Sequence, residues 1–458
     1  MTAADLAEKP PKSRPQLGRK FTLLWSASAI SSVGDGMRDS ALPLLAVAVS
    51  ESPSAVSVVS VAASLPFLVM SLYGGVLADR SDRRRLMWTI DALRAVVVLG
   101  FACWVFFADP PLLALAALAF LLGCGETVFS NAATSAVPEL VRPDQLDAAN
   151  GRMQANMLVG GNLIGPLLGS ALFAVAAGFP FTVDGVSFAL AAVLVAATGR
   201  STAARTRAGR PVLTEIREGV NWLFRHREVR MLAVLSTLGA LTCFMGTTMM
   251  VLMVTKVVKA PAASYGIVLA AGAIGGTAAS TLAGRLSRLL SRGTRIALSF
   301  LLMGVSLILM AFSTSVFEVA ALYGVIGFGI VTWNIQAVSL RQQAVPKDLL
   351  GRVNSCYMLL SRLGIMTGAA LSGWIASVTN IRTPLVVGGT LLLVLLVAVL
   401  FLLPRMTAME SPAQDQAQDP DQAQEPATGA PEATAAAPSS AAGTGSASAS
   451  ASASAENE

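Results

Sequence analysis

The chain has 458 residues, of which 54% are hydrophobic and 13% are charged, and its mean hydropathy is +0.64. A soluble domain usually carries about 25% charged residues, so the composition excludes an ordinary water-soluble protein. The apolar residues suffice for about twelve membrane-spanning helices of about 20 residues each. We therefore expect an all-α integral membrane protein.

The net charge of +6 is distributed unevenly along the chain. Residues 406–458 contain eight acidic residues and no Lys or Arg, so residues 1–405 carry a net charge of +14. A basic excess of this size is typical either of a nucleic-acid-binding patch or of a membrane topology signal. The positions of the bases relative to the apolar runs distinguish the two.

Six apolar runs, a polar stretch and six further apolar runs follow one another along the chain. The runs predict a six-helix bundle over 21–199, a cytoplasmic loop over 200–228 and a second six-helix bundle over 229–404. The expected spans lie near 22–49, 55–78, 86–107, 111–135, 148–177, 181–199, 229–256, 262–284, 294–313, 316–338, 351–377 and 383–404.

The basic residues favour one side of these spans. With a cytoplasmic N-terminus, 27 of the 33 Lys and Arg lie on the cytoplasmic side, three lie outside and three lie within spans. The positive-inside rule then predicts a multi-pass protein of the plasma or inner membrane with both termini in the cytoplasm. The basic excess is a topology signal, and we expect no nucleic-acid partner.

Three segments lie outside the expected bundles. Residues 1–20 have neither the apolar core nor the cleavage site of a signal peptide, so they form a cytoplasmic lead. Within the central loop, apolar residues recur at helical spacing over 211–228, which predicts an amphipathic helix on the inner leaflet. Residues 405–458 are rich in Ala, Ser, Pro and acids, and we expect a disordered cytoplasmic tail.

Cysteine and histidine usage argues against metal and thiol chemistry. The four cysteines lie inside apolar runs, and His226 is the only histidine. A loop histidine without a nucleophile or carboxylate motif nearby is most simply a solvated side chain. We therefore expect neither an enzyme nor a bound metal or cofactor.

The two halves of the chain repeat each other. The stretch PELVRPDQLDAANGRMQ before the fifth span matches QQAVPKDLLGRVNSCYM before the eleventh, and pairs Pro143 with Pro346 and Leu146 with Leu349. A parallel repeat of two six-helix halves is an architecture in which transport sites lie near the midplane between the halves.

The most specific string is GGVLADRSDRRRL at Gly74–Leu86, between the second and third spans. It closely resembles the signature loop of the major facilitator superfamily, although Asp82 stands where the family commonly has glycine. The resemblance implies a latch that holds the cytoplasmic side closed against the eleventh span. Positive-inside charge alone would explain the arginines of this loop but not an aspartate beside glycines. We assign to this latch Gly75, Asp79, Arg80 and Arg83, supported by Asp91 and Arg94.

The fifth span contains GNLIGPLLGS, which resembles the motif of the superfamily's exporters. Its small residues and proline are Gly161, Gly165, Pro166 and Gly169. Small residues four apart let helices approach closely, and generic helix packing is the alternative explanation. The resemblance implies packing against the eighth span, where Gly272, Gly275 and Gly276 offer a matching small face.

Charges inside membrane spans are candidate functional groups, because burying them is costly. Asp35, Arg38 and Asp39 lie within one turn of the first span, and Glu126 lies near the middle of the fourth. By the family resemblance, these two spans line the central cavity, where Asp35, Arg38 and Glu126 form a candidate proton-coupling and cation-binding site. The alternative for Asp35 and Arg38 is an ion pair that merely holds the first span in place.

Other intramembrane charges receive weaker assignments. Asp184 is expected to be a cap or packing partner near the outer end of the sixth span, and no role is assigned to Arg362. The second half contributes apolar and adaptable cavity candidates, each of which ordinary packing would explain equally well. These candidates are Phe244, Met249, Met250, Trp333, Asn334 and Gln336.

The span region 21–404 resembles the major facilitator superfamily, and its motifs look like those of the macrolide-efflux and enterobactin-exporter branch. The resemblance implies a monomeric antiporter that uses the proton gradient to expel a drug, antibiotic, siderophore or other hydrophobic or amphipathic small molecule, and thereby confers multidrug or antibiotic resistance. The alternatives are a nutrient uptake symporter and a non-transporting membrane sensor. The family's arginine-based proton relay cannot be transferred, because the fourth span has no arginine.

Overall fold

The computed structural model describes residues 17–50, 52–80, 82–199, 212–346 and 349–407. The side chains of residues 69, 71–80, 212–216 and 402–407 are not included in that description. Most of the cytoplasmic lead, the first part of the central loop and nearly all of the tail therefore lie outside the described residues.

The first half consists of five long helices and one span that is made of several consecutive pieces. The helices are α1 (Arg19–Val49), α2 (Pro53–Arg80), α3 (Arg83–Phe107), α4 (Leu112–Leu140) and α7 (Phe179–Ala196). Between α4 and α7, a single span comprises η1 (Pro143–Gln145), α5 (Leu146–Ala155), η2 (Asn156–Ile164) and α6 (Gly165–Val175).

The second half also combines five long helices with one segmented span, which here comes first, after a connecting helix. That helix is α8 (Val212–Arg225), and the next span comprises α9 (Arg227–Thr247), α10 (Met250–Leu252) and η3 (Met253–Val257). The remaining helices are α11 (Ala263–Leu289), α12 (Arg292–Ala311), α13 (Val316–Ala344), α14 (Leu350–Val378) and α15 (Thr383–Thr407).

Ten helical segments of the described chain are long and apolar enough to cross a membrane. Helix α1 has 31 residues but carries three charges near its middle, and the apolar part of α2 within the description is the shorter stretch Pro53–Leu68. Together with α1 and α2, the number of long segments matches the twelve expected spans. The prediction of an all-α membrane protein is confirmed.

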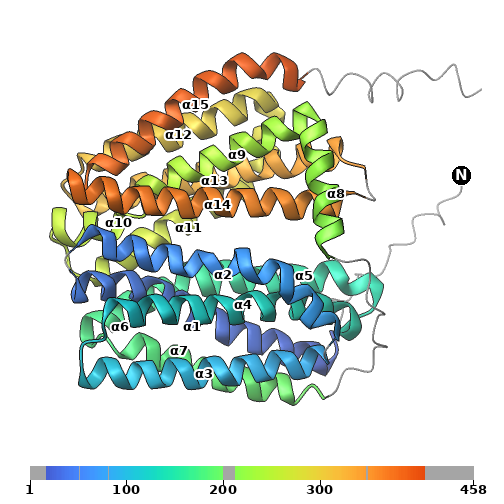
Figure 1. Cartoon of the computed structure of the whole chain (residues 1–458), viewed down its shortest axis with the longest axis vertical. Helices are drawn as coiled ribbons and strands as arrows, with labels where there is room; N and C mark the ends of the chain where they lie inside the picture. Colours follow the sequence, from blue (N-terminus) through green and yellow to red (C-terminus); the bar gives the residue numbers. More distant parts are fainter. Residues whose placement is uncertain (1–16, 51, 81, 200–211, 347–348, 408–458) are drawn as a thin grey trace, which may run out of the picture. The chain divides into compact units, whose positions relative to one another are not determined.

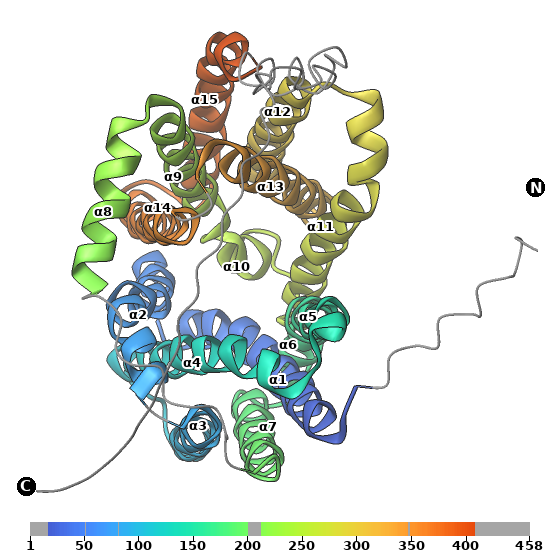
Figure 2. The same cartoon turned by 90° about the vertical axis from the view of Figure 1, so that its right-hand side faces the viewer.

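The helices group into two bundles that lie side by side (Figures 1 and 2). Helices α1 to α7 form one group, and α9 to α15 form the other. Helix α8 lies at the end of the bundles where α1 begins and α4 ends, and we name this the α8 end (Figure 1). The far end of the same helices is the opposite end.

The described contacts that join the two bundles lie at the opposite end and near the middle. Ser170 donates a hydrogen bond from Oγ to the carbonyl of Ala263 at 3.1 Å, and Ser57 packs against Gly373. The guanidinium of Arg362 lies 4.8 Å from the centre of the Phe67 ring. Arg362, which had no role assigned from the sequence, therefore forms a cation–π contact between the bundles.

The central part of the fifth span is a π-helix rather than an α-helix. Segment η2 has nine residues and ends where Gly165 and Pro166 begin α6. Proline has no backbone N–H to donate, so the regular hydrogen-bond pattern is interrupted at this point. π-Helical turns inside α-helices are rare and frequently occur at functional sites.

Helix α8 packs on the start of α14. Its Leu223 is buried, and the carboxylate of Glu218 accepts a 2.7 Å hydrogen bond from Nη1 of Arg352. Gly219 faces the backbone of Arg352, where a larger side chain would collide. The buried Leu223 and the exposed Phe224 show that α8 presents only part of its apolar surface to the bundle.

Candidate functional site

A polar cavity lies within the first bundle. It has a volume of about 550 Å³, and its lining comes from α1, α4, α5 and η2, with Arg94 from α3. Along α1 the lining runs from Asp39 to Ser28, and along α4 from Glu126 to Val137. The cavity therefore extends from the middle of the helices toward the α8 end.

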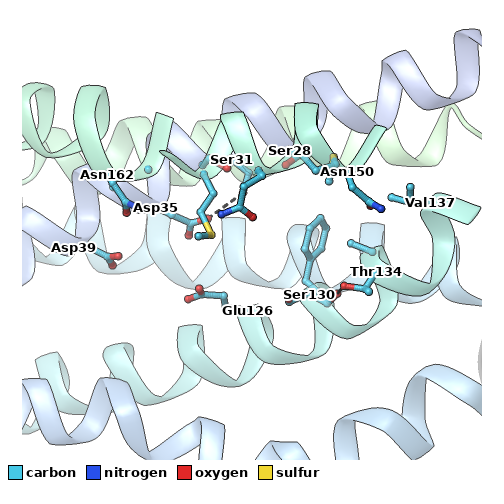
Figure 3. Close-up of a pocket in the computed structure, with 18 of the residues that line it drawn as sticks. Ser28, Ser31, Asp35, Asp39, Glu126, Ser130, Thr134, Val137, Asn150 and Asn162 are labelled. Atoms are coloured by element: carbon cyan, nitrogen blue, oxygen red, sulfur yellow. Dashed lines mark hydrogen bonds between the residues drawn. The ribbon is translucent and has the colours of Figure 1, made fainter. Parts of the chain in front are cut away.

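The cavity has a charged end and an uncharged end (Figure 3). Asp35, Asp39 and Glu126 gather at one end, together with Asn162 (Figure 3). Hydroxyl, amide and apolar side chains line the rest of the cavity toward the α8 end. These include Ser28, Ser130, Thr134, Val137 and Asn150.

Arg38 is the centre of the charged end. Its side chain is 4% exposed, and its Nη1 donates to Oδ1 of Asp35 at 2.7 Å while its Nη2 donates to Oδ1 of Asp39 at 3.0 Å. The same guanidinium reaches Oδ2 of Asp184 at 3.5 Å and Oε2 of Glu126 at 3.9 Å. One buried arginine thus contacts four carboxylates from three helices.

A second buried arginine approaches the same cluster from α3. Nη2 of Arg94 donates to Oδ1 of Asp35 at 2.9 Å, and Nη1 lies 3.7 Å from Oδ1 of Asp91. Its guanidinium also lies 3.9 Å from the centre of the Phe188 ring on α7. Arg94 therefore connects α1, α3 and α7 through one side chain.

Small residues on α1 bring these helices close enough for the charges to meet. A side chain at Gly34 would collide with Asp184 and Ser187 of α7, and one at Gly36 would collide with the backbone of Gly161. The sequence GDG therefore has a packing function besides carrying Asp35. Close approach of α7 to α1 places Asp184 beside Arg38.

The five carboxylates of the cluster differ sharply in exposure. The side chains of Asp39 and Glu126 are 66% and 61% exposed, whereas those of Asp91 and Asp184 are completely buried. With every group ionised, five carboxylates and two arginines give the cluster a formal charge of −3. The two exposed carboxylates face the cavity, so the excess negative charge is available to a ligand.

The buried carboxylates are incompletely satisfied within the described part of the chain. Oδ1 of Asp184 and both carboxylate oxygens of Asp91 have no hydrogen-bond partner there. An ionised carboxylate in such a position costs several kcal/mol unless ion pairing compensates for the lost hydration. The ionised forms of Asp184 and Asp91 therefore depend on ion pairing with Arg38 and Arg94.

The structure assigns Asp91, Arg94 and Asp184 to different surroundings from those expected. Asp91 and Arg94 were expected to support the latch, but Arg94 contacts Asp35 and lines the cavity. Asp184 was expected to be a cap or packing partner, but it lies 3.5 Å from Arg38. Spacing along one helix identified the Asp91–Arg94 pair, whereas the partner on another helix depends on how the helices pack.

The predicted latch is described only in part. The side chains of Asp79 and Arg80 lie outside the description, as do any contacts of Gly75. Asp82 caps α3 by accepting from the backbone N–H groups of Arg84 and Arg85, which gives this departure from the family pattern a local function. Arg83, which the sequence assigned to the latch, donates to Glu139 of α4 at 2.6 Å.

The glycine motif of the fifth span packs mainly against α1. Gly165 and Gly169 lie against the backbone of α1, and Gly161 lies against Gly36. The fifth span also packs against α11, the eighth span, as expected, but the expected small face is wrong: Gly272, Gly275 and Gly276 of α11 face α13. The contact with α11 is made by Pro166, Leu167 and Ser170, which lie against Gly266. A stripe of small residues predicts close packing but not the identity of the neighbouring helix.

The second-half candidates do not line this cavity. Met249, Met250 and Gln336 are buried, and Trp333 packs edge-to-face on Phe300 with ring centres 5.1 Å apart. Phe244 and Asn334 are exposed. The residues that line the 550 Å³ cavity include none of these six.

A second cavity of about 440 Å³ lies between the bundles. Leu158, Val159 and Leu163 of η2 line one side, and Ile274 and Ala278 of α11 are among the residues on the other side. Met157, Gly161 and Asn162 of the same π-helix line the polar cavity. Segment η2 therefore separates a charged cavity from a mainly apolar one.

Sequence reasoning missed two members of the cluster. Asp184 and Asp91 are acidic residues inside apolar spans, and that property alone was a signal for both of them. Asp39 was noticed but left out of the candidate site, although its carboxylate lines the cavity.

Among the described residues, no group of three or more His, Cys, Asp or Glu side chains is arranged to hold a metal ion.

The sequence profile of one protein family, the transmembrane secretion effectors, matches residues 14–429. Several curated efflux proteins also match. The multidrug efflux pump Tap of Mycolicibacterium fortuitum is 25% identical over 401 residues, which cover 85% of this chain and 96% of the pump. Macrolide efflux protein A of Streptococcus pyogenes is 22% identical over 382 residues, covering 82% and 93%. The Tap pump of Mycobacterium tuberculosis strain H37Rv is 27% identical over 227 residues, and the match spans only about half of each chain, 48% and 54%.

Solved structures of several transporters have the same fold. The nucleoside transporter NupG superposes with a TM-score of 0.67 at 13% identity, covering 86% of this chain and 100% of that one. A bacterial homologue of the iron transporter ferroportin in an inward-facing state gives 0.65 at 17% identity, covering 83% and 98%. At these identities, the similarity establishes the fold and nothing about the substrate.

Proposed function

The chain belongs to the transmembrane secretion effector family within the major facilitator superfamily, and on that basis we propose that it is a proton-coupled exporter of hydrophobic or amphipathic small molecules. The membership makes it a multi-pass membrane transporter and not an enzyme. The proposal adds the direction of transport, the coupling ion and the chemical class of the substrate. The observation that carries it is the pair of exposed carboxylates, Asp39 and Glu126, beside a buried arginine cluster.

The charge of the cavity supports a cationic substrate. Asp39 and Glu126 lie 3.0 and 3.9 Å from Arg38, which must also serve Asp35 and Asp184. One guanidinium cannot neutralise four carboxylates, so an organic cation is favoured at the exposed pair. A proton released from the cluster when the cation binds would couple substrate movement to the pH gradient.

The apolar surroundings support an amphipathic substrate. Phe129, Val137 and Met153 line the polar cavity together with its hydroxyl and amide groups. Binding sites for small molecules typically combine a mainly apolar wall with a few polar groups that fix orientation. A cation with an apolar body fits this lining better than a highly hydrated nutrient would.

Two observations support export. The fifth-span motif resembles that of the superfamily's exporters, and the curated relatives are named as efflux proteins.

The excess of basic residues in the loops of the α8 end supports a cytoplasmic position for this end. The cavity then extends toward the cytoplasm, while Ser170–Ala263 and Ser57–Gly373 close the outer end.

A transport assay in reconstituted vesicles tests the proposal. The full chain is reconstituted with an imposed pH gradient, and movement of the lipophilic cation tetraphenylphosphonium against its gradient is measured. We expect transport by the wild type, none without the pH gradient, and a large loss in Asp39→Asn with Glu126→Gln. The matched control is Asp144→Asn, which removes an exposed carboxylate paired with Arg142 outside the cavity. Equal transport with and without the pH gradient would contradict proton coupling.

A further inference from the structure

We propose that Asp184 carries the proton that is exchanged for the substrate cation, and that Arg38 transmits the occupancy of Asp39 and Glu126 to it. This inference rests on the proposed function, because it specifies where the coupled proton resides. It assigns Asp184 to coupling although this side chain does not line the cavity.

The position of Arg38 is the first observation. Arg38 lies between two kinds of carboxylate: Asp39 and Glu126 are exposed to the cavity, and Asp184 is completely buried. Its contact with Asp39 is 3.0 Å, whereas that with Asp184 is 3.5 Å. The guanidinium therefore lies closer to Asp39 than to Asp184, while Glu126, at 3.9 Å, is farther away than either.

The unsatisfied oxygen of Asp184 is the second observation. Oδ1 of Asp184 has no hydrogen-bond partner among the described residues, and the hydroxyl of Ser187 donates to the backbone carbonyl of Asp184 rather than to its carboxylate. A buried carboxyl group with only one long ion-pair contact is favoured in its neutral form. Closer approach of Arg38 would favour the ionised form.

Every charged group near Asp184 must be included in this argument. Helix α1 contributes Asp35, Arg38 and Asp39. Helices α3 and α4 contribute Arg94, Asp91 and Glu126, and α6, which also packs on α7, has no charged residue. Of the two arginines, Arg38 is the one that contacts Asp184, at 3.5 Å, whereas Arg94 contacts Asp35 and Asp91.

The exchange follows from the competition for Arg38. A substrate cation that binds Asp39 and Glu126 neutralises their negative charge in place of Arg38. The guanidinium of Arg38 is then attracted more strongly to the buried Asp184. Asp184 then releases its proton to the water of the cavity and pairs with Arg38. When the cation leaves, Arg38 returns toward Asp39, and Asp184 takes up a proton again. Each cycle thus exchanges one cation for one proton, and Arg38 keeps its charge throughout.

A permanent structural role for Asp184 is the alternative. In that case, Asp184 is always ionised and holds α7 to α1 through Arg38. Replacement by Asn would then lower stability but would leave proton release on substrate binding unchanged. Proton release is therefore the measurement that separates the two roles.

The experiment uses the purified full chain in weakly buffered detergent solution with a pH-indicating dye. Tetraphenylphosphonium is added, its binding is measured by equilibrium dialysis, and the released protons are titrated over a range of pH values. For the wild type we expect about one proton per bound cation in the pH range where Asp184 is protonated. We expect Asp184→Asn to bind the cation with almost complete loss of proton release. Asp144→Asn, which lies outside the cluster, is expected to behave as the wild type does.

The outcomes separate this inference from the proposed function. If the wild type binds no cation, or binds it without proton release at every pH, the proposed function fails. If the wild type releases protons and Asp184→Asn releases them equally, the assignment of Asp184 is overturned and the proposed function stands. Should Asp184→Asn fail to fold, Asp184→Glu keeps the carboxyl group but moves it by one methylene. We expect this variant to shift the pH profile of proton release, and an unchanged profile would also overturn the assignment.

Discussion

Arg94 of α3 donates a 2.9 Å hydrogen bond to Asp35 of α1, although Asp91 lies three residues before it on its own helix and is 3.7 Å away. The shorter contact is the one between helices. Asp91 is completely buried, and neither of its carboxylate oxygens has a hydrogen-bond partner among the described residues. The guanidinium of Arg94 is thus shared between a short contact across the bundle and a long contact along α3.

Removal of Arg94 is expected to destabilise the first bundle strongly. Arg94→Gln leaves Asp91 buried without its ion-pair partner, and breaking a buried pair typically costs about 3–5 kcal/mol. The free energy of unfolding in a denaturing detergent measures this loss. We expect Asp91→Asn in the same chain to recover part of it, because the uncompensated buried charge is then absent. Equal stability of the single and double variants would contradict the pairing.

The ion pair between Arg83 and Glu139 is expected to contribute measurably to stability. The two side chains are only 22% and 15% exposed and lie 2.6 Å apart, so they join α3 to α4 with little competition from water. A double-mutant cycle with Arg83→Ala and Glu139→Ala should give a coupling energy of about 1–2 kcal/mol. The control pair, Arg142 and Asp144, is 72% and 64% exposed, and its coupling energy should be below about 0.5 kcal/mol. Similar coupling energies for the two pairs would mean that burial does not strengthen the first.

The close contact between α1 and the fifth span predicts opposite effects for two similar substitutions. A Cβ atom on Gly165 would lie 2.7 Å from the Cα of Gly36, so Gly165→Ala forces the two backbones apart. We expect a loss of about 2–3 kcal/mol. Gly151 lies in α5 with nothing within 4 Å of its Cβ position, so Gly151→Ala should instead stabilise the helix by about 0.5–1 kcal/mol. Thermal unfolding of both variants gives the comparison, and tolerance of Gly165→Ala would contradict the observed packing.

A cross-link at the opposite end should stop transport without preventing binding. Gly373 of α14 lies against Ser57 of α2, so cysteines at these two positions are close enough to form a disulfide after small adjustments. The four native cysteines are first replaced by Ser. Oxidation of the Ser57→Cys, Gly373→Cys chain should abolish tetraphenylphosphonium transport, and reduction should restore it.

The binding measurement distinguishes a locked transporter from a damaged one. The cavity lies within the first bundle and extends toward the α8 end, so a cross-link at the opposite end should leave cation binding unchanged. Either single-cysteine variant serves as the control for oxidation. Full transport by the oxidised, cross-linked chain would show that these helices need not separate during the cycle.

The sequence by itself determined the class of the protein. The length and spacing of the apolar runs required membrane-spanning helices, because backbone polar groups in a bilayer must be satisfied within the spanning element. The loop string at Gly74–Leu86 indicated the superfamily, and the charges of the first and fourth spans located part of the cluster. The structure brings these predicted residues together, because the carboxylates of Asp35 and Glu126 lie 2.7 and 3.9 Å from the guanidinium of Arg38.

The tertiary structure decided which residues are neighbours across helices. The acidic residue of α7, Asp184, could be recognised as unusual but not as a partner of Arg38, because the rotation of α7 about its axis depends on packing at Gly34. The same reason explains why Gly165 and Gly169 of the fifth span face α1, whereas Gly275 of α11 faces α13. Periodicity specifies the face of a helix that carries a group of residues, whereas close packing between particular surfaces specifies the helix that this face meets.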